Sequence, residues 1–376
     1  MKILFLNTLH PYNDGRIYYK EAISLSKESH QVIILGPYED VNSFDVNITI
    51  KGYGKAKYFK RLMNTIHLFK SCWKEKADVL QCNELDSWFV GVIIGKIKKI
   101  PVIFDAHEYY PSRFQGKITS PIEKLARTSI KIFMYILSIN STIIITVSEQ
   151  LKNLYSFLKC SVVIVHNYAL ITNNVSLTAL KGKKDHYPVL IHIGYVNANR
   201  GIDIMIKGIK KLKNRYPKIL LIIVGKHNDT IKKQNEIRQL INDLEVGNNI
   251  TFTGWINFAD VPEYLAISHV GIILFQNRLF NNSIGLPHKF FEYLQAGLPV
   301  IVPNKSILAE YVNKYNVGKG VDSSNIDSFV NGILKLISER ENLDCRKNRI
   351  KKLASKEFSW DTESKKYIKI FGKIAK

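Results

Sequence analysis

Short apolar runs without polar alternation constrain the fold of this chain more than any other feature. Runs such as "ILFL" at 3–6 and "LLIIV" at 220–224 indicate strands of a parallel sheet that is covered on both faces. Amphipathic segments at about 17–27, 84–97, 201–216 and 229–244 read as helices between such strands. The alternation predicts an α/β fold of doubly wound, Rossmann-like parallel sheets. The expected strands lie within 3–6, 31–36, 77–83, 101–108, 142–149, 161–168, 189–196, 218–225, 249–256, 270–275 and 299–304.

The length of 376 residues suits two such domains rather than one. We predict one Rossmann-like domain over 1–174, a second over 175–356, and a C-terminal helix over 357–376 that packs back on the first domain. The polar, patternless stretch 169–187 is expected to link the two domains. Ligands bind beyond the carboxyl ends of the strands in open sheets, so a central cleft is expected to hold them.

Cysteine usage and apolar runs indicate where the protein works. The four cysteines are scattered without metal-type spacing, which predicts a reducing compartment, the cytoplasm. The N-terminal "MKILFLNT" lacks a cleavage site, and no apolar run reaches the roughly 18 residues of a membrane span.

The net charge of +22, from 54 Lys and Arg against 32 Asp and Glu, favours an anionic partner. A phosphorylated ligand and an anionic membrane surface both fit, and a lysine-rich genome would give the same excess. Nucleic acid is not expected, because the sequence has no aromatic-rich basic strand pattern of the RNA-binding type.

The segment "GLPHKFFEYLQAGLPVIVPN" (285–304) carries the strongest chemical signal. A Gly-Leu-Pro loop opens a helix whose first N–H groups and dipole suit a phosphate, and Lys289 adds a cation there. Glu292, one turn in, can accept two hydroxyl hydrogen bonds from a ribose. The bland alternative is that Glu292 complements the dipole of the helix, which is worth about 0.3–1 kcal/mol.

This segment resembles the donor-binding segment of retaining GT-B-fold glycosyltransferases of family 4. The resemblance implies that Glu292 binds the donor ribose. It also implies a first Glu eight residues earlier, where this chain has Ile284. A subgroup has "L-P-x-K-x-F-E-Y" instead, as at 286–293, and backbone amides around Gly285 and Leu286 are then expected to replace the missing carboxylate.

Three further segments match positions of the family. The family has Gly-Arg and then Lys-Gly after the first strand of the second domain, and "GYVNANRG" (194–201) has Tyr195 and Arg200 there, so Arg200 is expected on the diphosphate. In "LHPYNDGRI" (9–17), Gly15 is expected near the donor. Asp14 and Arg16 are then acceptor or cleft residues, or a local helix cap.

"FDAHEYYP" (104–111) follows an expected strand. The resemblance implies that His107 lies near the donor sugar as the catalytic group, with Glu108 as a polar cleft residue. In "NELDSW" (83–88), Asp86 is expected to cap a helix.

Residues 58–74, "YFKRLMNTIHLFKSCWK", place five apolar side chains in one helical stripe. From Lys51 to Lys76 there are eight Lys or Arg and one acidic residue. The stripe either packs on the sheet or lies on anionic lipid. Its members are Phe59, Leu62, Ile66, Phe69 and Trp73.

Together these features predict a glycosyltransferase with an N-terminal acceptor-side domain and a C-terminal nucleotide-sugar domain. It would move a sugar from a nucleoside-diphosphate donor to a hydroxyl of a lipid-linked or polysaccharide acceptor in cell-surface glycan synthesis. The resemblance implies retention of configuration and no required metal, and no other cofactor is expected. We expect it in the cytoplasm, peripheral on the inner face of the membrane. The alternatives are a sugar-nucleotide epimerase of the same fold and a non-catalytic basic module that binds membrane or nucleic acid.

Overall fold

The computed structural model describes residues 1–43, 45–54, 59–116, 119–171, 187–276, 279–338 and 343–374. The chain folds into two compact units. Unit 1 contains Met1–Asn167 and Trp360–Lys376, and unit 2 contains Tyr168–Ser359. Most of the expected linker lies outside the described residues.

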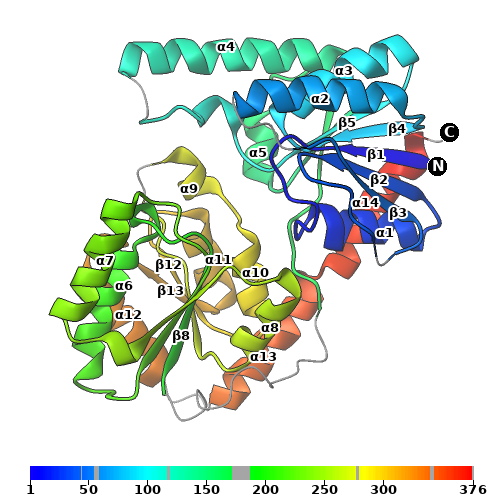
Figure 1. Cartoon of the computed structure of the whole chain (residues 1–376). Helices are drawn as coiled ribbons and strands as arrows, with labels where there is room; N and C mark the ends of the chain where they lie inside the picture. Colours follow the sequence, from blue (N-terminus) through cyan, green and yellow to red (C-terminus); the bar gives the residue numbers. More distant parts are fainter. Residues whose placement is uncertain are drawn as a thin grey trace. The chain divides into compact units, whose positions relative to one another are not determined.

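The strands of unit 1 form a parallel sheet in the order β3-β2-β1-β4-β5-β6-β7 (Figure 1). The buried strands are those with uninterrupted apolar runs, as expected, and β3 is an addition that the sequence did not reveal. Its alternation of buried Ile with an exposed Thr and a half-buried Lys is typical of an edge strand rather than a central one. The strands are β1 (Lys2–Leu6), β2 (Gln31–Gly36), β3 (Ile48–Gly52), β4 (Val79–Cys82), β5 (Val102–Ala106), β6 (Ile143–Thr146) and β7 (Ser161–Ile164).

Helices cover both faces of this sheet. Figure 1 shows α2, α3 and α4 along one face and α1 and α14 along the other. The C-terminal helix expected from residue 357 begins at Trp360 instead, because α13 of unit 2 continues to Glu357. Helix α14 packs on η1 and α1. The helices are η1 (Ile17–Ala22, a π-helical turn), α1 (Ile23–Lys27), α2 (Lys60–Lys74), α3 (Leu85–Lys98), η2 (Tyr110–Ser112), α4 (Ser120–Ile139), α5 (Glu149–Leu154) and α14 (Trp360–Ile374).

Unit 2 repeats the scheme with a parallel sheet in the order β10-β9-β8-β11-β12-β13. The central strands β8, β9, β11 and β12 are almost wholly buried, as parallel strands between two helical layers require, whereas the edge strands β10 and β13 are partly exposed. The strands are β8 (Val189–Ile193), β9 (Leu220–Val224), β10 (Ile250–Gly254), β11 (Val270–Ile272), β12 (Val300–Pro303) and β13 (Gly318–Val321).

Two apolar clusters fill the space on the two sides of this sheet. One is built with α6 and α12, and the other with α8, α10, α11 and α13. The helices and short turns are η4 (Ala198–Arg200), α6 (Ile202–Lys213), α7 (Ile231–Asp243), η5 (Gly247–Asn249), η6 (Phe258–Asp260), α8 (Val261–Ala266), α9 (Phe280–Ile284), α10 (His288–Gln295), α11 (Ile307–Tyr315), α12 (Ile326–Ser338) and α13 (Leu343–Glu357).

Each sheet reverses its strand order at one point. In unit 1 the order reverses between β1 and β4, and in unit 2 between β8 and β11. The loops leaving two such strands run in opposite directions and open a crevice in which α/β proteins bind their ligands. These two switch points are therefore where a functional site is expected in each unit.

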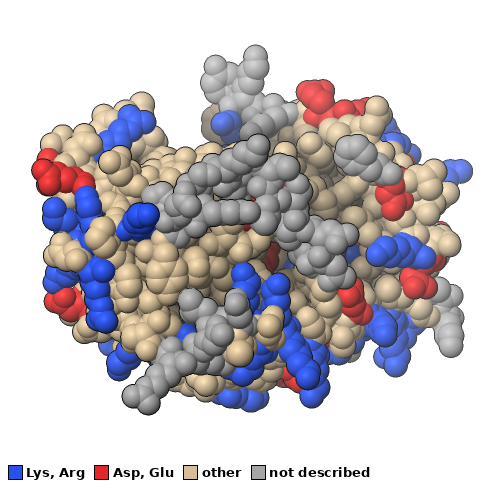
Figure 2. Space-filling view, turned by 90° about the horizontal axis from the view of Figure 1, so that it is seen from below, with Lys and Arg blue, Asp and Glu red and all other residues tan. Residues whose placement is uncertain are grey.

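Lys and Arg side chains are spread across the face drawn in Figure 2, interspersed with Asp and Glu. The positive charge is thus distributed over this face rather than gathered in one segment of the chain. None of the described helices combines the length and the apolar character that crossing a bilayer requires.

Candidate functional site

The switch point of unit 2 gathers the residues expected to hold a donor. The loop Gly194–Arg200 follows β8, Phe275 lies shortly after β11, and the N-terminus of α10 lies beside them. The backbone N–H of Gln276 donates to the Asn199 carbonyl at 3.0 Å, which ties the two strand-end loops together.

Two side chains of α10 hold the end of β8. Lys289 Nζ donates to the Ile193 carbonyl oxygen at 2.6 Å, and the Ile193 N–H donates to the Tyr293 hydroxyl at 2.9 Å. Both polar backbone groups of one residue are thus satisfied from one helix. This explains the spacing of Lys and Tyr in the 286–293 motif, because residues four apart share a helix face.

The absence of a side chain at Gly194 leaves space for the Lys289 ammonium group at the end of β8. Gly194 has φ +128, in the region that favours glycine, and a Cβ there would lie 3.3 Å from Lys289 Nζ. Lys289 therefore brings a cation next to the glycine after β8. The family's Arg is expected immediately after that glycine, where this chain has Tyr195, which is 42% exposed.

Arg200 and Lys289 approach the same aromatic ring. The Arg200 guanidinium carbon lies 4.4 Å from the centroid of the Phe275 ring, and Lys289 Nζ lies 5.1 Å from it. Such contacts with the ring stabilise both cations modestly. Gly201, with φ +70, permits the approach, because a Cβ there would lie 2.8 Å from the Leu274 carbonyl oxygen.

The surroundings of both side chains disfavour their charged forms. Burial, with the charge of Arg200, holds the pKa of Lys289 well below its usual value, while Glu292 acts in the opposite direction. Burial also lowers the pKa of Arg200. An anion that entered here would relieve both effects, since an opposite charge favours the protonated form.

Glu292 lies on α10 one turn beyond Lys289 and is half-buried. Leu286 is 5% exposed and belongs to the core of unit 2, so only its backbone is available to a ligand. Gly285 packs closely on the end of α9, where a Cβ would lie 2.7 Å from the Asn281 carbonyl oxygen. Ile284, which occupies the place of the family's first Glu, ends α9.

In unit 1, His107 follows β5 and is held by a buried ion pair. Its Nε2 lies 2.6 Å from Asp105 Oδ2. The same carboxylate accepts two hydrogen bonds from Arg16, from Nε at 2.8 Å and from Nη2 at 3.0 Å. Asp105 and Arg16 are both 0% exposed. Burial opposes the charge on Asp105, but Arg16 and His107 hold its pKa well below the usual range.

Arg16 is thus enclosed within unit 1, where Glu21 also lies 2.8 Å from its Nε. In this structure its guanidinium is not available to a ligand, in contrast to its expected place among cleft residues. The reason is that Arg16 pairs with Asp105 of β5, a contact between distant residues that a sequence pattern does not reveal. Burial and the neighbouring Asp105 raise the pKa of Glu21 well above its usual value.

Asp14 caps the helical turn that follows it. Its Oδ1 accepts the N–H groups of Arg16 at 2.8 Å and Ile17 at 3.1 Å, and Oδ2 lies 3.2 Å from His10 Nδ1. Gly15 lies between them in the loop after β1 and is half-buried. Of the two alternatives for Asp14, a cleft residue or a local helix cap, the structure shows the helix cap.

Glu84 was not singled out from the sequence, yet it organises the switch point of unit 1. Its carboxylate accepts backbone N–H groups of Thr8 at 3.0 Å, Leu9 at 3.0 Å and His10 at 3.1 Å. Glu84 also caps α3 in a capping box with Ser87. An acidic residue directly after a buried strand was the signal available for it.

The expected cap, Asp86, is not the cap of α3. Its carboxylate accepts hydrogen bonds from Arg61 at 2.5 and 2.6 Å and from the Thr8 hydroxyl at 3.1 Å. Glu84 takes the N-cap place because its extended backbone conformation directs the side chain at the first turn.

His10 is the second histidine at this edge, with its ring centroid 6.1 Å from that of His107. Burial disfavours its charge, but the hydrogen bond with Asp14 and the charges of Glu84 and Asp14 raise the pKa of His10 to about 9. Glu108 lies beside this edge, half-buried, with its backbone carbonyl accepting the Tyr155 hydroxyl.

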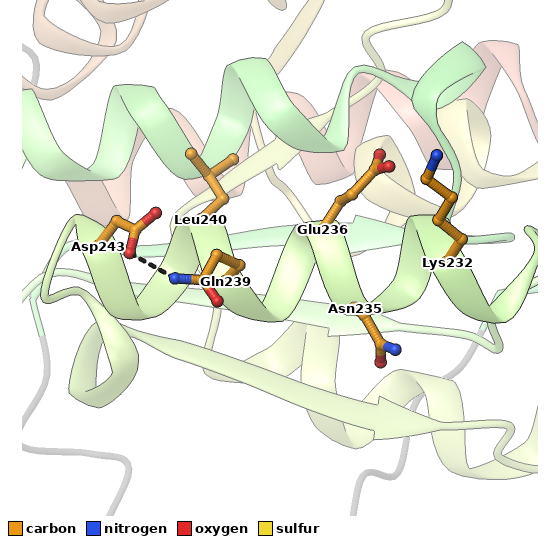
Figure 3. A pocket seen from close by; sticks show the side chains of 6 residues that line it. All are labelled: Lys232, Asn235, Glu236, Gln239, Leu240 and Asp243. Atoms are coloured by element: carbon orange, nitrogen blue, oxygen red, sulfur yellow. Dashed lines mark hydrogen bonds between the residues drawn. The ribbon is translucent and has the colours of Figure 1, made fainter.

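A further hollow lies along α7 of unit 2 (Figure 3). Its lining side chains all come from this one helix, and Gln239 Nε2 donates to Asp243 Oδ1 at 2.8 Å within it. None of the expected donor residues lines it, so we do not place the donor there. In the part of the chain that the structure describes, no group of three or more His, Cys, Asp and Glu residues is arranged to hold a metal ion.

Comparisons with known proteins show which sequences and folds this chain resembles. Residues 178–353 match the sequence model of the family described as "Glycosyl transferases group 1". An uncharacterized glycosyltransferase of Methanocaldococcus jannaschii is 22% identical over 316 residues, which cover 80% of this chain and 76% of that protein. A Mycobacterium tuberculosis protein named GDP-mannose-dependent alpha-(1-6)-phosphatidylinositol monomannoside mannosyltransferase is 24% identical over 178 residues, 46% of this chain and 45% of that protein.

Solved structures extend the likeness to the whole fold. Anabaena HepE in complex with UDP superimposes with a TM-score of 0.73 at 15% identity, covering 99% of this chain and 100% of that one. WaaG, a glycosyltransferase involved in lipopolysaccharide biosynthesis, gives 0.72 at 14% identity and covers 98% of each chain. The expected GT-B fold, with two Rossmann-like units, is thereby confirmed.

The chain therefore has the GT-B fold, and residues 178–353, in unit 2, are similar to the glycosyl transferases group 1 family.

Proposed function

We propose that this protein transfers a sugar from a nucleoside-diphosphate donor to a hydroxyl of a lipid-linked or polysaccharide acceptor, with retention of configuration, in cell-surface glycan synthesis. The observation that carries the donor part is the pairing of Arg200 and Lys289 on Phe275 at the switch point of unit 2. The UDP complexes of HepE and the mannosyl and lipopolysaccharide activities named for other relatives support the substrate classes.

The diphosphate is assigned to the two cations and to the N-terminal N–H groups of α10. Fixed donors and cations stabilise the charge that develops on a leaving diphosphate, so the proposal requires no metal. Glu292 accepts the ribose hydroxyls. The backbone around Gly285 contacts the sugar in place of the carboxylate that is missing at Ile284.

The reaction is proposed to take place on one face of the sugar. The bond between the anomeric carbon and the diphosphate oxygen breaks, and the acceptor oxygen bonds to the same carbon on the same side. The acceptor proton passes to the leaving phosphate oxygen. Retention follows without a protein nucleophile.

His107 is assigned to the reacting groups from unit 1. Asp105 holds one ring nitrogen of His107 at 2.6 Å, and Arg16 fixes Asp105 from behind with two hydrogen bonds. A carboxylate on one nitrogen sets the orientation and the tautomer of the ring. Arg16 and Asp105 are thus positioning residues, and the other nitrogen of His107 is left for substrate.

The test is release of nucleoside diphosphate from UDP-, GDP- and ADP-sugars in the presence of a bacterial lipid extract, with NMR of the product's anomeric proton. We expect turnover with one nucleotide and the donor's anomeric configuration in the product. Arg200→Ala should abolish turnover, whereas Arg215→Ala, an exposed arginine of the same unit, should not. Product of inverted configuration would overturn the retaining assignment, and equal activity of Arg200→Ala would overturn the donor site.

A further inference from the structure

Helix α4 presents apolar side chains to solvent, the reverse of an ordinary surface helix. Its buried residues are Met134, Leu137 and Ser138. The exposed residues recur at steps of three, four or seven, so they form one stripe on the opposite side of the helix. Each is between 53% and 67% exposed: Ile122, Leu125, Ile132, Ile136 and Ile139.

The N-terminal half of α4 extends beyond the core of unit 1. All residues from Ser120 to Ile130 are described, and none of them is buried. Figure 1 shows α4 as the outermost helix on its face of the sheet. Packing within unit 1 therefore does not account for the apolar residues of this half.

The apolar surface continues over the neighbouring helices. The expected stripe before and along α2 does not pack on the sheet, since Phe59 is 83% and Leu62 64% exposed and the buried face of α2 is formed by other residues. On α3, Phe89 is 40% exposed and lies 5.8 Å, centroid to centroid, from Phe133 of α4. A patch of this extent on three adjacent helices marks an interaction surface.

Helices α2 and α4 carry many more basic than acidic residues. Helix α2 carries Lys and Arg but no Asp or Glu, and α4 carries one acidic residue, Glu123. A second copy of the chain would bring the same positive charges to the patch, which disfavours a dimer through this face. Anionic lipid complements both the apolar stripe and its charges. The cations are Lys60, Arg61, Lys70 and Lys74 on α2, and Lys124, Arg127 and Lys131 on α4.

We propose that the exposed faces of α2, α3 and α4, named here the α2–α4 face, bind an anionic bilayer with α4 lying in the plane of the interface. This inference rests on the proposed function, because a lipid-linked acceptor would require the protein to reach a membrane. It adds that α4 makes most of the membrane contact.

The test is co-sedimentation of the full chain with vesicles of phosphatidylcholine alone and of phosphatidylcholine mixed with phosphatidylglycerol. We expect binding to the mixed vesicles that weakens as salt rises. The double variant Ile132→Ser/Ile136→Ser should lower the partition constant about tenfold or more. Ile231→Ser, which changes a 76% exposed isoleucine on α7, is the matched control and should bind like the parent.

The charge contribution is tested by Lys124→Glu/Lys70→Glu, which should lose binding to the mixed vesicles. All these side chains are exposed, so circular dichroism should show an unchanged fold. Equal vesicle binding by the isoleucine variant would overturn the proposal. A concentration-dependent dimer in sedimentation velocity that the same variant abolishes would also overturn it, in favour of a second copy.

Nucleotide titration of the same variants separates this proposal from the donor site. Variants that lose vesicle binding should still bind nucleotide. If the parent binds vesicles but no nucleotide, the donor proposal fails and the α2–α4 face stands.

Discussion

Replacing Tyr293 by Phe tests whether α10 is fastened to the end of β8 as the structure shows. Tyr293 is 0% exposed, and its hydroxyl accepts the Ile193 N–H at 2.9 Å and contacts the Ile272 carbonyl oxygen at 3.4 Å. The ring packs against Gly271, where a Cβ would lie 2.4 Å from a ring carbon. Phe keeps the ring and its packing and removes only the oxygen.

The expected loss of stability follows from the Ile193 N–H, which loses its acceptor. Without the hydroxyl, the partly buried Ile193 N–H has no acceptor from α10. Leaving a buried donor unsatisfied costs about 1–3 kcal/mol. The ring remains, so no large cavity adds to this cost. We therefore expect Tyr293→Phe to lower the free energy of unfolding by about 1–3 kcal/mol.

Urea unfolding, followed by circular dichroism, measures this change. The control is Tyr315→Phe, a half-buried tyrosine of the same aromatic cluster whose hydroxyl has no hydrogen bond within the described residues. It should change stability by less than about 0.5 kcal/mol, as substitutions without a lost partner do. If the two variants lose the same free energy, the hydrogen bond to Ile193 does not stabilise unit 2 and the reasoning is refuted.

Three further predictions follow from buried charges. Because the pKa of free Lys289 is held well below its usual value, nucleotide binding should take up a proton and weaken as pH rises, which titrations in buffers of different ionisation enthalpy measure. Asp105→Asn should cost roughly 3–5 kcal/mol of unfolding free energy, since it leaves the buried Arg16 without its bidentate partner; a loss under 1 kcal/mol in urea unfolding would contradict this. Burial opposes the charge of Glu363, yet hydrogen bonds from His166 and Lys366 lower its pKa to about 2. The ionised Glu363 therefore adds roughly 3 kcal/mol to the free energy of unfolding. This stability is complete above the unfolded pKa of about 4.5 and is lost as pH falls through about 2. Glu363→Gln should remove that pH dependence from thermal unfolding curves.

The sequence predicted the parts of the fold that depend on local pattern. The central strands and most intervening helices follow from apolar runs and amphipathic periods, because these patterns are visible within a few consecutive residues. Strands β3 and β13 were not predicted, because each is a short edge strand with few apolar side chains. The apolar stripe that includes Phe59 and Leu62 was predicted from its helical period. Such a period identifies one face of a helix but does not show what that face contacts.

The candidate site was predicted in its residue types more than in its contacts. Arg200, Lys289 and Glu292 do share a neighbourhood, as the motif implied. The bond from Lys289 to the Ile193 carbonyl depends on which strands are neighbours in the sheet, and that information is not local. The same holds for Arg16, whose partner Asp105 lies on a strand far away in sequence.

Isothermal titration of the purified chain with UDP, GDP and ADP, beside Glu292→Ala and the exposed control Glu310→Ala, tests the central claim most directly. We expect micromolar binding of one nucleotide, retained by Glu310→Ala. Glu292→Ala should weaken it by roughly 10- to 100-fold, the equivalent of about 1.5–3 kcal/mol for hydrogen bonds to a charged group. Failure to bind any of the three, or equal binding by Glu292→Ala, would contradict the assignment of the donor site to the switch point of unit 2.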